Sequence, residues 1–375
     1  MKKLLCFFLS AFILLPAFSA AAAAPETVSP SVLLMEKESG KILYEKDSHK
    51  KLPPASVTKV MTLLLVMEAI ESEKIKLDDK VSVSEHAASM GGSQVFLAAG
   101  EEMSVNDLLK ATTIASGNDS AVALAEFISG SESGFVEMMN ARAKELGMND
   151  TSFKNCTGLD ADGHVTSAHD IAIMSRELIK HEKIKEYSTT WMDSLRNGAF
   201  TLANTNKLIR SYQGITGLKT GSTSTAKFCL SATAKRNGME LIATIMAAPS
   251  SKERFSDASK LLDFGFANYG IYNPEDKADL KEIPVILGKA ESVPICFSSS
   301  PATLVEKSKI GNLEAKLELP ENISAPVEKG QTVGYLKILS GEEVVSEVSI
   351  IASEGVERLD FIGIFRLFAS EIFMR

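Results

Sequence analysis

Three short segments constrain the fold of this chain more than any other feature, because their side chains form one site only if the fold brings them together. They are Ser56-Val57-Thr58-Lys59, Ser116-Gly117-Asn118 and Lys219-Thr220-Gly221, separated by about 60 and then about 100 residues. A serine followed three residues later by a lysine is common by chance. The ordered set of three is uncommon, and it predicts a fold in which a helix, a turn and a strand meet at one cleft.

The first segment pairs a serine with a lysine on a helix expected to run from about residue 56 to residue 70. Residues three apart on a helix are neighbours, so the amine of Lys59 can approach the hydroxyl of Ser56. A serine hydroxyl is a strong nucleophile only when a base removes its proton, and a lysine acts as that base only if its pKa falls. Burial and a second cation, for which Lys219 is the candidate, would lower that pKa. Taken alone, the same tetrapeptide is more typical of an ordinary helix start.

The second segment lies between two predicted helices, where a tight turn at Gly117 would direct the side chains of Ser116 and Asn118 inward. A serine in that position can pass a proton to a leaving amine, and an asparagine amide can hold a substrate carbonyl. An ordinary helix-breaking turn has the same composition, so the interpretation depends on the other two segments.

The third segment precedes a predicted hairpin, which places it on an edge strand beside the helix of Ser56. Lys219 and Thr220 can bind a carboxylate, and we expect Gly221 to leave room for a substrate backbone. The backbone N–H groups of Ser56 and Ser222 could then form an oxyanion hole.

The N-terminus has the layout of a secretory signal peptide, which we expect to occupy residues 1–24. Two lysines precede an apolar run from Leu4 to Phe18, and small residues follow that run. The run is shorter than the about 18 residues of a membrane-spanning helix, which favours cleavage over the alternative of an uncleaved anchor. We therefore expect the rest of the chain to be secreted across the cytoplasmic membrane.

Composition argues against several classes of function. The net charge is −8, and a nucleic-acid partner would require a basic surface. Beyond the signal peptide, Cys156, Cys229 and Cys296 have neither disulfide nor zinc spacing, so we expect buried free thiols. The sequence has no His-Glu-x-x-His pair and no Gly-x-Ser-x-Gly elbow, and we expect neither a metal nor another cofactor.

Residues 25–272 are predicted to form an α+β domain in which helices cover one antiparallel sheet. Residues 31–36 and 42–46 are typical of a hairpin, and so are residues 228–235 and 240–247 around Asn237-Gly238. The strands thus come from both ends of the domain, with helical periodicity between them. Further helices are expected at about residues 105–116, 120–128, 134–146, 167–181 and 252–269.

Two further segments follow this domain. Residues 276–352 contain short β-rich runs separated by Gly and Pro, which predict a small all-β domain. Residues 355–375 carry apolar side chains at helical spacing, interrupted by charges, and are too short and too charged to span a bilayer. They fit an amphipathic helix lying on the membrane surface, and a terminal helix packed on the β domain is the alternative.

The motifs and their flanking residues resemble the D-alanyl-D-alanine carboxypeptidases, which are low-molecular-weight penicillin-binding proteins of peptidase family S11. The resemblance covers about residues 30–270, and its supporting segments are residues 54–62, 114–121, 153–160, 204–208 and 214–223. It implies a β-lactamase/transpeptidase-like fold and a peptidoglycan stem peptide ending in D-Ala-D-Ala as substrate. The β domain and the amphipathic tail also fit the plan of this group.

The resemblance further implies a two-step acyl transfer. Ser56 attacks the carbonyl between the two terminal D-alanines, Lys59 acts as base, and Ser116 helps to protonate the leaving D-alanine before water releases the acyl-enzyme. Penicillin would acylate Ser56 and remain bound. The substrate-binding residues implied are Asn118, Lys219, Thr220, Gly221 and Ser222.

Two alternatives stay open. A serine β-lactamase of the same fold would need a deacylating glutamate in a Glu-x-x-Leu-Asn context between the second and third motifs, and residues 137–140 and 145–149 come closest without matching. A non-catalytic wall-binding or β-lactam-sensing protein would keep the fold without the reaction. The presence of every motif side chain argues against this second alternative.

Overall fold

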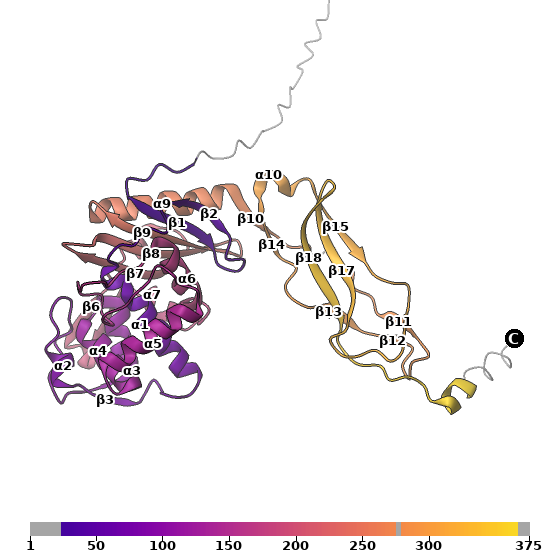
Figure 1. Cartoon of the computed structure of the whole chain (residues 1–375), viewed down its shortest axis with the longest axis horizontal. Coiled ribbons are helices and arrows are strands. Elements are labelled where there is room, and N and C mark those ends of the chain that lie inside the picture. The colour runs from indigo at the N-terminus through magenta and orange to yellow at the C-terminus, as the bar shows by residue number, and fades with distance from the viewer. Residues whose placement is uncertain (1–23, 275–278, 367–375) are drawn as a thin grey trace, which may run out of the picture.

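The computed structural model describes residues 24–274 and 279–366, which form two regions joined at one end (Figure 1). The N-terminal region combines a sheet with helices, and the C-terminal region consists mainly of strands. Except for Ala24, the predicted signal peptide lies outside the described residues, as do residues 367–375 of the predicted tail.

A five-stranded antiparallel sheet organises the N-terminal region, with the strand order β2-β1-β9-β8-β7. Its strands are β1 (Ser31–Glu36), β2 (Ile42–Lys46), β7 (Ile215–Thr223), β8 (Lys227–Arg236) and β9 (Met239–Ala248). The turn between β8 and β9 has positive φ angles at both Asn237 and Gly238, as the hairpin prediction requires. Because β1 pairs with β9, strands from the two ends of the region share one sheet, and the predicted architecture is confirmed.

Helices cover both faces of this sheet (Figure 1). On one face lies α9 (Ser251–Asn268), where Gly265 permits close packing because a Cβ there would lie 2.5 Å from Leu241 and 2.9 Å from Leu34. The other helical elements are η1 (Ala55–Thr58), α1 (Lys59–Glu71), α2 (Glu85–Ala88), α3 (Val105–Lys110), the π-helical turn η2 (Ala111–Ala115), α4 (Asn118–Ser129), α5 (Glu132–Glu145), α6 (Ala168–Leu178), α7 (Ile184–Ser188), η3 (Arg196–Gly198) and α8 (Leu208–Ser211). Two small two-stranded sheets, β3 (Lys80–Ser82) with β4 (Glu102–Ser104) and β5 (Met192–Leu195) with β6 (Phe200–Ala203), complete the region.

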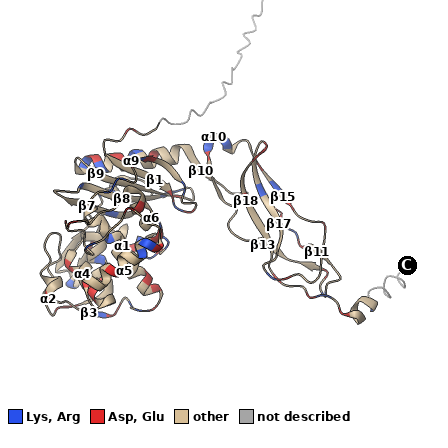
Figure 2. Ribbon diagram, viewed as in Figure 1, with Lys and Arg blue, Asp and Glu red and all other residues tan. Residues whose placement is uncertain are grey.

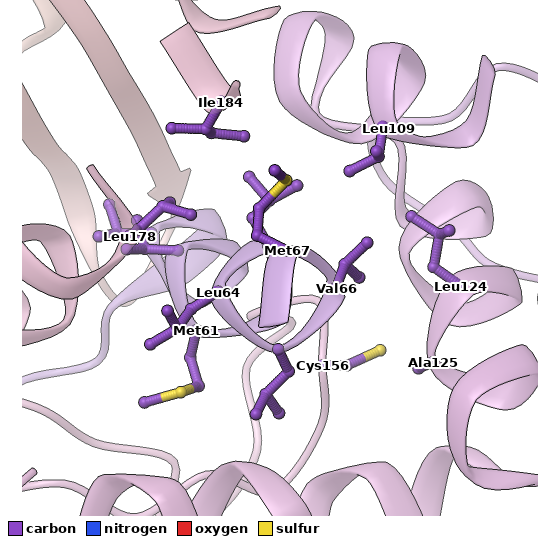
Figure 3. Packing of buried hydrophobic residues seen from close by; sticks show 14 of the residues in the cluster. Met61, Leu64, Val66, Met67, Leu109, Leu124, Ala125, Cys156, Leu178 and Ile184 are labelled. Carbon is purple, nitrogen blue, oxygen red and sulfur yellow. The ribbon is translucent and has the colours of Figure 1, made fainter. Parts of the chain in front are cut away.

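Helix α1 lies inside the larger helical group. Residues 59–67 are all buried, which is the pattern of a helix enclosed on every side. Figure 3 shows Leu64 and Met67 of this helix among residues of surrounding elements, including Leu109 and Leu178. The first turn of α1 is therefore held by the main hydrophobic core of the region.

Basic and acidic residues are interspersed along both regions (Figure 2). One group of charges supports the start of β7, where Lys185 and Lys37 lie 3.0 and 3.6 Å from the buried carboxylate of Glu240. The hydroxyl of Thr216 donates to the same carboxylate at 2.8 Å. This network fixes the strand that carries Lys219.

The C-terminal region contains a four-stranded antiparallel sheet, β13-β18-β17-β15, and a three-stranded sheet, β12-β11-β16. Its strands are β11 (Ile283–Ile286), β12 (Ser292–Val293), β13 (Ile295–Phe297), β15 (Leu313–Glu318), β16 (Ile323–Ser324), β17 (Thr332–Ser340) and β18 (Glu343–Ala352). The connection to the first region is made by β10 (Tyr269–Tyr272), which directly follows α9 and pairs with β14 (Thr303–Glu306), next to α10 (Lys307–Ile310). The predicted β-rich character of this part is confirmed, and the boundaries at residues 272 and 276 stay predictions.

The three cysteines described are free thiols. Cys156 and Cys229 are buried as expected, but Cys296 is half-buried, so the expectation is wrong for that residue. The reason is its place in β13, a three-residue strand at the edge of the four-stranded sheet.

The described part of the predicted tail is residues 355–366, and only residues 361–366 are helical. The helix prediction is wrong for residues 355–360, because Val356 pairs with Val327 and is buried in the core of the β domain. Phe361, Ile362 and Phe365 are 83%, 61% and 68% exposed, so in the helical part the apolar side chains are not packed on the β domain. Among the described residues, no helix has both the length and the apolar character needed to cross a bilayer.

Leu34 provides a test of the packing between the sheet and α9. It is fully buried in the cluster beneath that helix. We expect Leu34→Ala to lower the free energy of unfolding by about 2–5 kcal/mol, because buried contacts are lost and a cavity remains. Urea denaturation followed by circular dichroism measures the change, and the exposed Val28→Ala is the control. A loss below about 0.5 kcal/mol for Leu34→Ala would contradict this packing.

Candidate active site

The three sequence motifs meet at the start of α1. Ser56 lies in η1, is half-buried, and its hydroxyl oxygen is 3.2 Å from the amine nitrogen of Lys59, the first residue of α1. The Lys59 side chain is fully buried. Its Nζ also donates to Oδ1 of Asn118 at 2.6 Å and to the backbone carbonyl of Thr157 at 2.8 Å. The prediction that the serine and the lysine lie within reach of one another is confirmed.

The surroundings of the Lys59 amine favour its uncharged form. Burial lowers the pKa of Lys59 to about 7, although the nearby Cys156 and Asp119 act in the opposite direction. The Asn118 and Thr157 oxygens that contact Nζ are acceptors, so the two N–H bonds of a neutral amine can be given to them. The lone pair of that amine is then left facing Ser56, whose hydroxyl can donate its proton.

The second motif occupies a strained turn between η2 and α4. Ser116 has a left-handed backbone with φ +64°, and the backbone N–H of Gly117 donates back to Ala111 across the π-helical turn. This conformation brings the side chains of Ser116 and Asn118 toward α1, where they are 3% and 2% exposed. The predicted inward direction of both side chains is confirmed, but the left-handed residue of the turn is Ser116 and not Gly117, whose φ is −54°.

Lys219 joins the second motif to the third. Its Nζ donates to the hydroxyl of Ser116 at 2.8 Å and to the carbonyl of Thr220 at 3.1 Å. Burial lowers the pKa of Lys219 well below its usual value, and the positive charges of Lys59 and Arg254 lower that pKa further. We expected burial and the charge of Lys219 to lower the pKa of Lys59. Burial does lower it, whereas the repulsion between the two cations acts on the pKa of Lys219.

The missing side chain at Gly221 permits a close contact within the chain itself. A Cβ at this position would lie 2.8 Å from the backbone nitrogens of Ser56 and Val57 and 2.9 Å from the carbonyl oxygen of Pro54. The space on the Cβ side is therefore filled by the chain's own backbone, and the expectation that a substrate backbone lies alongside Gly221 stays a prediction. Gly221 allows the edge strand β7 to lie directly against η1.

The remaining motif side chains lie around this contact. Thr220 is 5% exposed and its hydroxyl donates to the hydroxyl of Thr205 at 2.7 Å, while Ser222 is exposed. The amide of Asn118 donates to the carbonyl of Gly91 at 2.6 Å and, because an NH₂ group has two hydrogens, retains one for another acceptor.

Sequence reasoning missed Arg254, which lies beneath the third motif. It is 7% exposed, and its Nη1 donates to the carbonyls of Gly221 at 2.9 Å and Cys229 at 3.3 Å. Burial lowers its pKa to about 10, and Nε has no hydrogen-bond partner within the described structure. Its guanidinium lies over the rings of Phe228 and Phe255. No spacing rule links this arginine to the motifs, because the packing of α9 on the sheet brings it there.

Asp119 was also missed, although it directly follows the second motif. Its buried carboxylate accepts the backbone N–H groups of Val95 at 2.9 Å and Leu97 at 3.1 Å, and so holds a loop beside Asn118. The sequence signal was its adjacency to the motif. The loop that it holds could not be identified before the fold was known.

The fold and the serine–lysine pair define a serine acyl-transfer enzyme of the transpeptidase-like class. Residues 18–250 match the D-alanyl-D-alanine carboxypeptidase family, Peptidase S11, and residues 267–358 match the C-terminal domain of penicillin-binding protein 5. The chain belongs to the D-alanyl-D-alanine carboxypeptidase family and is a serine peptidase.

Relatives cover nearly the whole chain. The chain is 46% identical over 338 residues to the D-alanyl-D-alanine carboxypeptidase DacF of Bacillus subtilis, covering 88% of this chain and 87% of that protein. It is 34% identical over 368 residues to DacC of Escherichia coli, covering 94% and 92%.

The fold of this chain is also similar to solved structures of penicillin-binding proteins. Penicillin-binding protein 5 of Haemophilus influenzae superposes with a TM-score of 0.76 at 30% identity, covering 90% of this chain and 100% of that one. Penicillin-binding protein D2 of Listeria monocytogenes in its cefotaxime-bound form gives 0.60 at 33% identity, covering 65% and 100%.

The lowered pKa of Lys59 predicts a pH profile. If Lys59 must be neutral to accept the proton of Ser56, activity is lost as pH falls through about 7, where the amine becomes protonated. We expect kcat/KM for D-alanine release to rise with pH up to about 7 and then level off, apart from any loss at higher pH. Initial rates on a D-Ala-D-Ala peptide between about pH 5 and pH 9 test this. A profile that is flat from about pH 5 to pH 7 would exclude a lysine base of this pKa.

Proposed function

We propose that this enzyme removes the terminal D-alanine from peptidoglycan stem pentapeptides through an acyl-enzyme on Ser56. The observation that carries the proposal is the buried Lys59 amine, 3.2 Å from the Ser56 hydroxyl and fixed by two acceptors on its other sides. Family membership supports the same reaction and substrate class.

In the acylation step, neutral Lys59 takes the proton from Ser56 as the serine oxygen bonds to the carbonyl carbon between the two D-alanines. The backbone N–H groups of Ser56 and Ser222 are the proposed donors to the developing oxyanion. The close contact between η1 and β7, which the absence of a Cβ at Gly221 permits, supports that pairing.

Collapse of the tetrahedral species breaks the peptide bond and releases D-alanine. Ser116 is the proposed proton donor to the leaving amine, and its hydroxyl would regain a proton from the lysine pair, which holds the one that Lys59 took from Ser56. Within that pair, Lys219 donates a hydrogen bond to the hydroxyl of Ser116. Lys219 and Thr220 would hold the terminal carboxylate of the substrate, and Asn118 would donate its remaining amide hydrogen to a substrate carbonyl. A bound carboxylate would also favour the charged form of Lys219. Water then hydrolyses the ester.

A β-lactam antibiotic would acylate the same serine. Penicillin-binding protein D2 of Listeria monocytogenes, a structural relative, has been solved in cefotaxime- and ampicillin-bound forms. The groups that contact the Lys59 amine are a hydroxyl, an amide oxygen and a backbone carbonyl, and within the described residues none of the three is a carboxylate. This favours a slowly hydrolysed penicilloyl-enzyme over a β-lactamase.

We place the enzyme outside the cytoplasmic membrane, facing the cell wall. The predicted signal peptide supports secretion, and the exposed Phe361, Ile362 and Phe365 at the start of the tail support its contact with a membrane surface. The helical residues 361–366 lie at the end of the β domain remote from the N-terminal region (Figure 1). The β domain would therefore hold the active site away from the lipid.

Ser56→Ala tests the nucleophile. We expect loss of both fluorescent-penicillin labelling and D-alanine release, because no oxygen remains to form the ester. Mass spectrometry after incubation with a diacyl-D-alanyl-D-alanine peptide, and separately with penicillin, should place the adduct of the unaltered enzyme on Ser56. Retained release of D-alanine by Ser56→Ala would assign the nucleophile elsewhere, and rapid turnover of nitrocefin without an accumulating adduct would favour the β-lactamase alternative.

Deletion of residues 361–375, which leaves the buried Val356 in the β domain, tests the membrane contact. We expect the truncated enzyme to be recovered in the soluble fraction with D-alanine release intact, since the active site lies in the other region. A matched control replaces the exposed Phe361 and Phe365 by serine, which should weaken binding to vesicles in the same direction. If the truncated protein still pellets with membranes, the anchor lies in another part of the chain.

A further inference from the structure

We propose that His164 is a positioning residue for acylation, holding the catalytic turn through a hydrogen bond to Thr58. The catalytic turn is the segment from Ser56 to Lys59. His164 is 3% exposed, and its Nε2 lies 2.8 Å from the hydroxyl oxygen of Thr58. Its other ring nitrogen, Nδ1, accepts the backbone N–H of Lys154 at 3.0 Å. The inference rests on the proposed role of Ser56 as nucleophile.

The contact with Lys154 determines which ring nitrogen carries the proton. A backbone N–H can only donate, so Nδ1 of His164 must be unprotonated and Nε2 must carry the hydrogen. Nε2–H then donates to Thr58 Oγ1. Burial lowers the pKa of His164 to about 4, with Asp160 raising it and Lys154 lowering it. At neutral pH the imidazole is therefore uncharged and both hydrogen bonds can form together.

The same histidine closes the loop that contacts Lys59. Lys154 and His164 lie at its two ends, and between them the carbonyl of Thr157 accepts a hydrogen bond from the Lys59 amine at 2.8 Å. The ring of Phe153 packs edge-on against the imidazole, with centroids 5.9 Å apart. His164 thus fixes the catalytic turn directly and the Thr157 carbonyl through the loop, so that Lys59 is held from two sides.

Loss of this imidazole should affect rate more than binding. Thr58 lies between Ser56 and Lys59 in the chain, and a small shift of this turn changes the distance between hydroxyl and amine. A displacement of about 1 Å at reacting groups can slow a reaction about 100-fold. The proposed carboxylate-binding groups on β7 do not contact His164, so the KM for a D-Ala-D-Ala peptide should change little.

Four single variants of the full chain and one double variant test the proposal. His164→Leu removes both hydrogen bonds, His164→Gln offers one acceptor and one donor in their place, and Thr58→Val removes the acceptor alone. His49→Leu changes a histidine whose side chain is 64% exposed and is the matched control. For each variant, fluorescent penicillin gives the acylation rate constant and the final fraction labelled on Ser56, peptide hydrolysis gives kcat and KM, and thermal melting gives Tm.

We expect His164→Leu to slow acylation about 10- to 100-fold while the final labelled fraction stays near that of the unaltered enzyme. His164→Gln should restore most of the rate, His49→Leu should leave it unchanged, and His164→Leu combined with Thr58→Val should be no slower than the slower single variant. The labelled fraction counts folded sites, whereas the rate constant reports their geometry. A purely structural role would lower the fraction or the Tm without changing the rate.

Three results would overturn the proposal. These are an unchanged acylation rate in His164→Leu, a loss confined to the labelled fraction, and a His164→Gln variant as slow as His164→Leu. If His164→Leu does not fold, Thr58→Val becomes the test of the proposal, since it removes only one hydroxyl. An unchanged acylation rate in Thr58→Val would then refute the proposed role of the hydrogen bond between His164 and Thr58. Failure of the unaltered enzyme to label at Ser56 would refute the proposed nucleophile instead, which keeps the two hypotheses distinguishable.

Discussion

The burial of the Lys59 amine is the constraint on which the rest of this structure depends. A charged ammonium is unfavourable in a dry interior, so a fully buried lysine whose hydrogen bonds go to neutral oxygens is held near its uncharged form. Asn118 and the carbonyl of Thr157 accept its N–H groups and leave Ser56 on the remaining side. Burial therefore lowers the pKa of Lys59, and the two acceptors leave the lone pair of its amine facing Ser56. The second motif and the loop after α5 supply these acceptors.

Holding these groups within hydrogen-bond distance requires backbone conformations that are unfavourable for most residues. Ser116 adopts φ +64° after a π-helical turn, and Ala55 has φ +48° directly before Ser56. Gly158 accommodates the second of these, because a Cβ there would lie 1.9 Å from the carbonyl oxygen of Ala55. The hydrophobic core around α1 and the five-stranded sheet supply the rigid frame that maintains such strain.

Much of the fold could be predicted from local patterns. Alternation and turn residues located β1, β2, β8 and β9, and helical periodicity located α1 and α9 within a few residues. These signals are strong because each element buries one face or its whole surface, so apolar residues recur along it at a regular spacing. Very short strands such as β14 and β16 were missed, since two to four residues carry too little periodicity to distinguish them from a loop.

By itself, the sequence determined the reactive groups and the order in which they occur, because the chemistry of Ser56, Lys59, Ser116 and Lys219 belongs to their side chains. Only the tertiary structure decided their surroundings: which amine is buried, that Gly221 makes room for the chain's own backbone, and that Arg254 and His164 approach the motifs from distant segments. A pKa, a tautomer and a hydrogen-bond distance depend on neighbours from other parts of the chain. Local pattern carries no information about those neighbours until the sheet and the helices have packed.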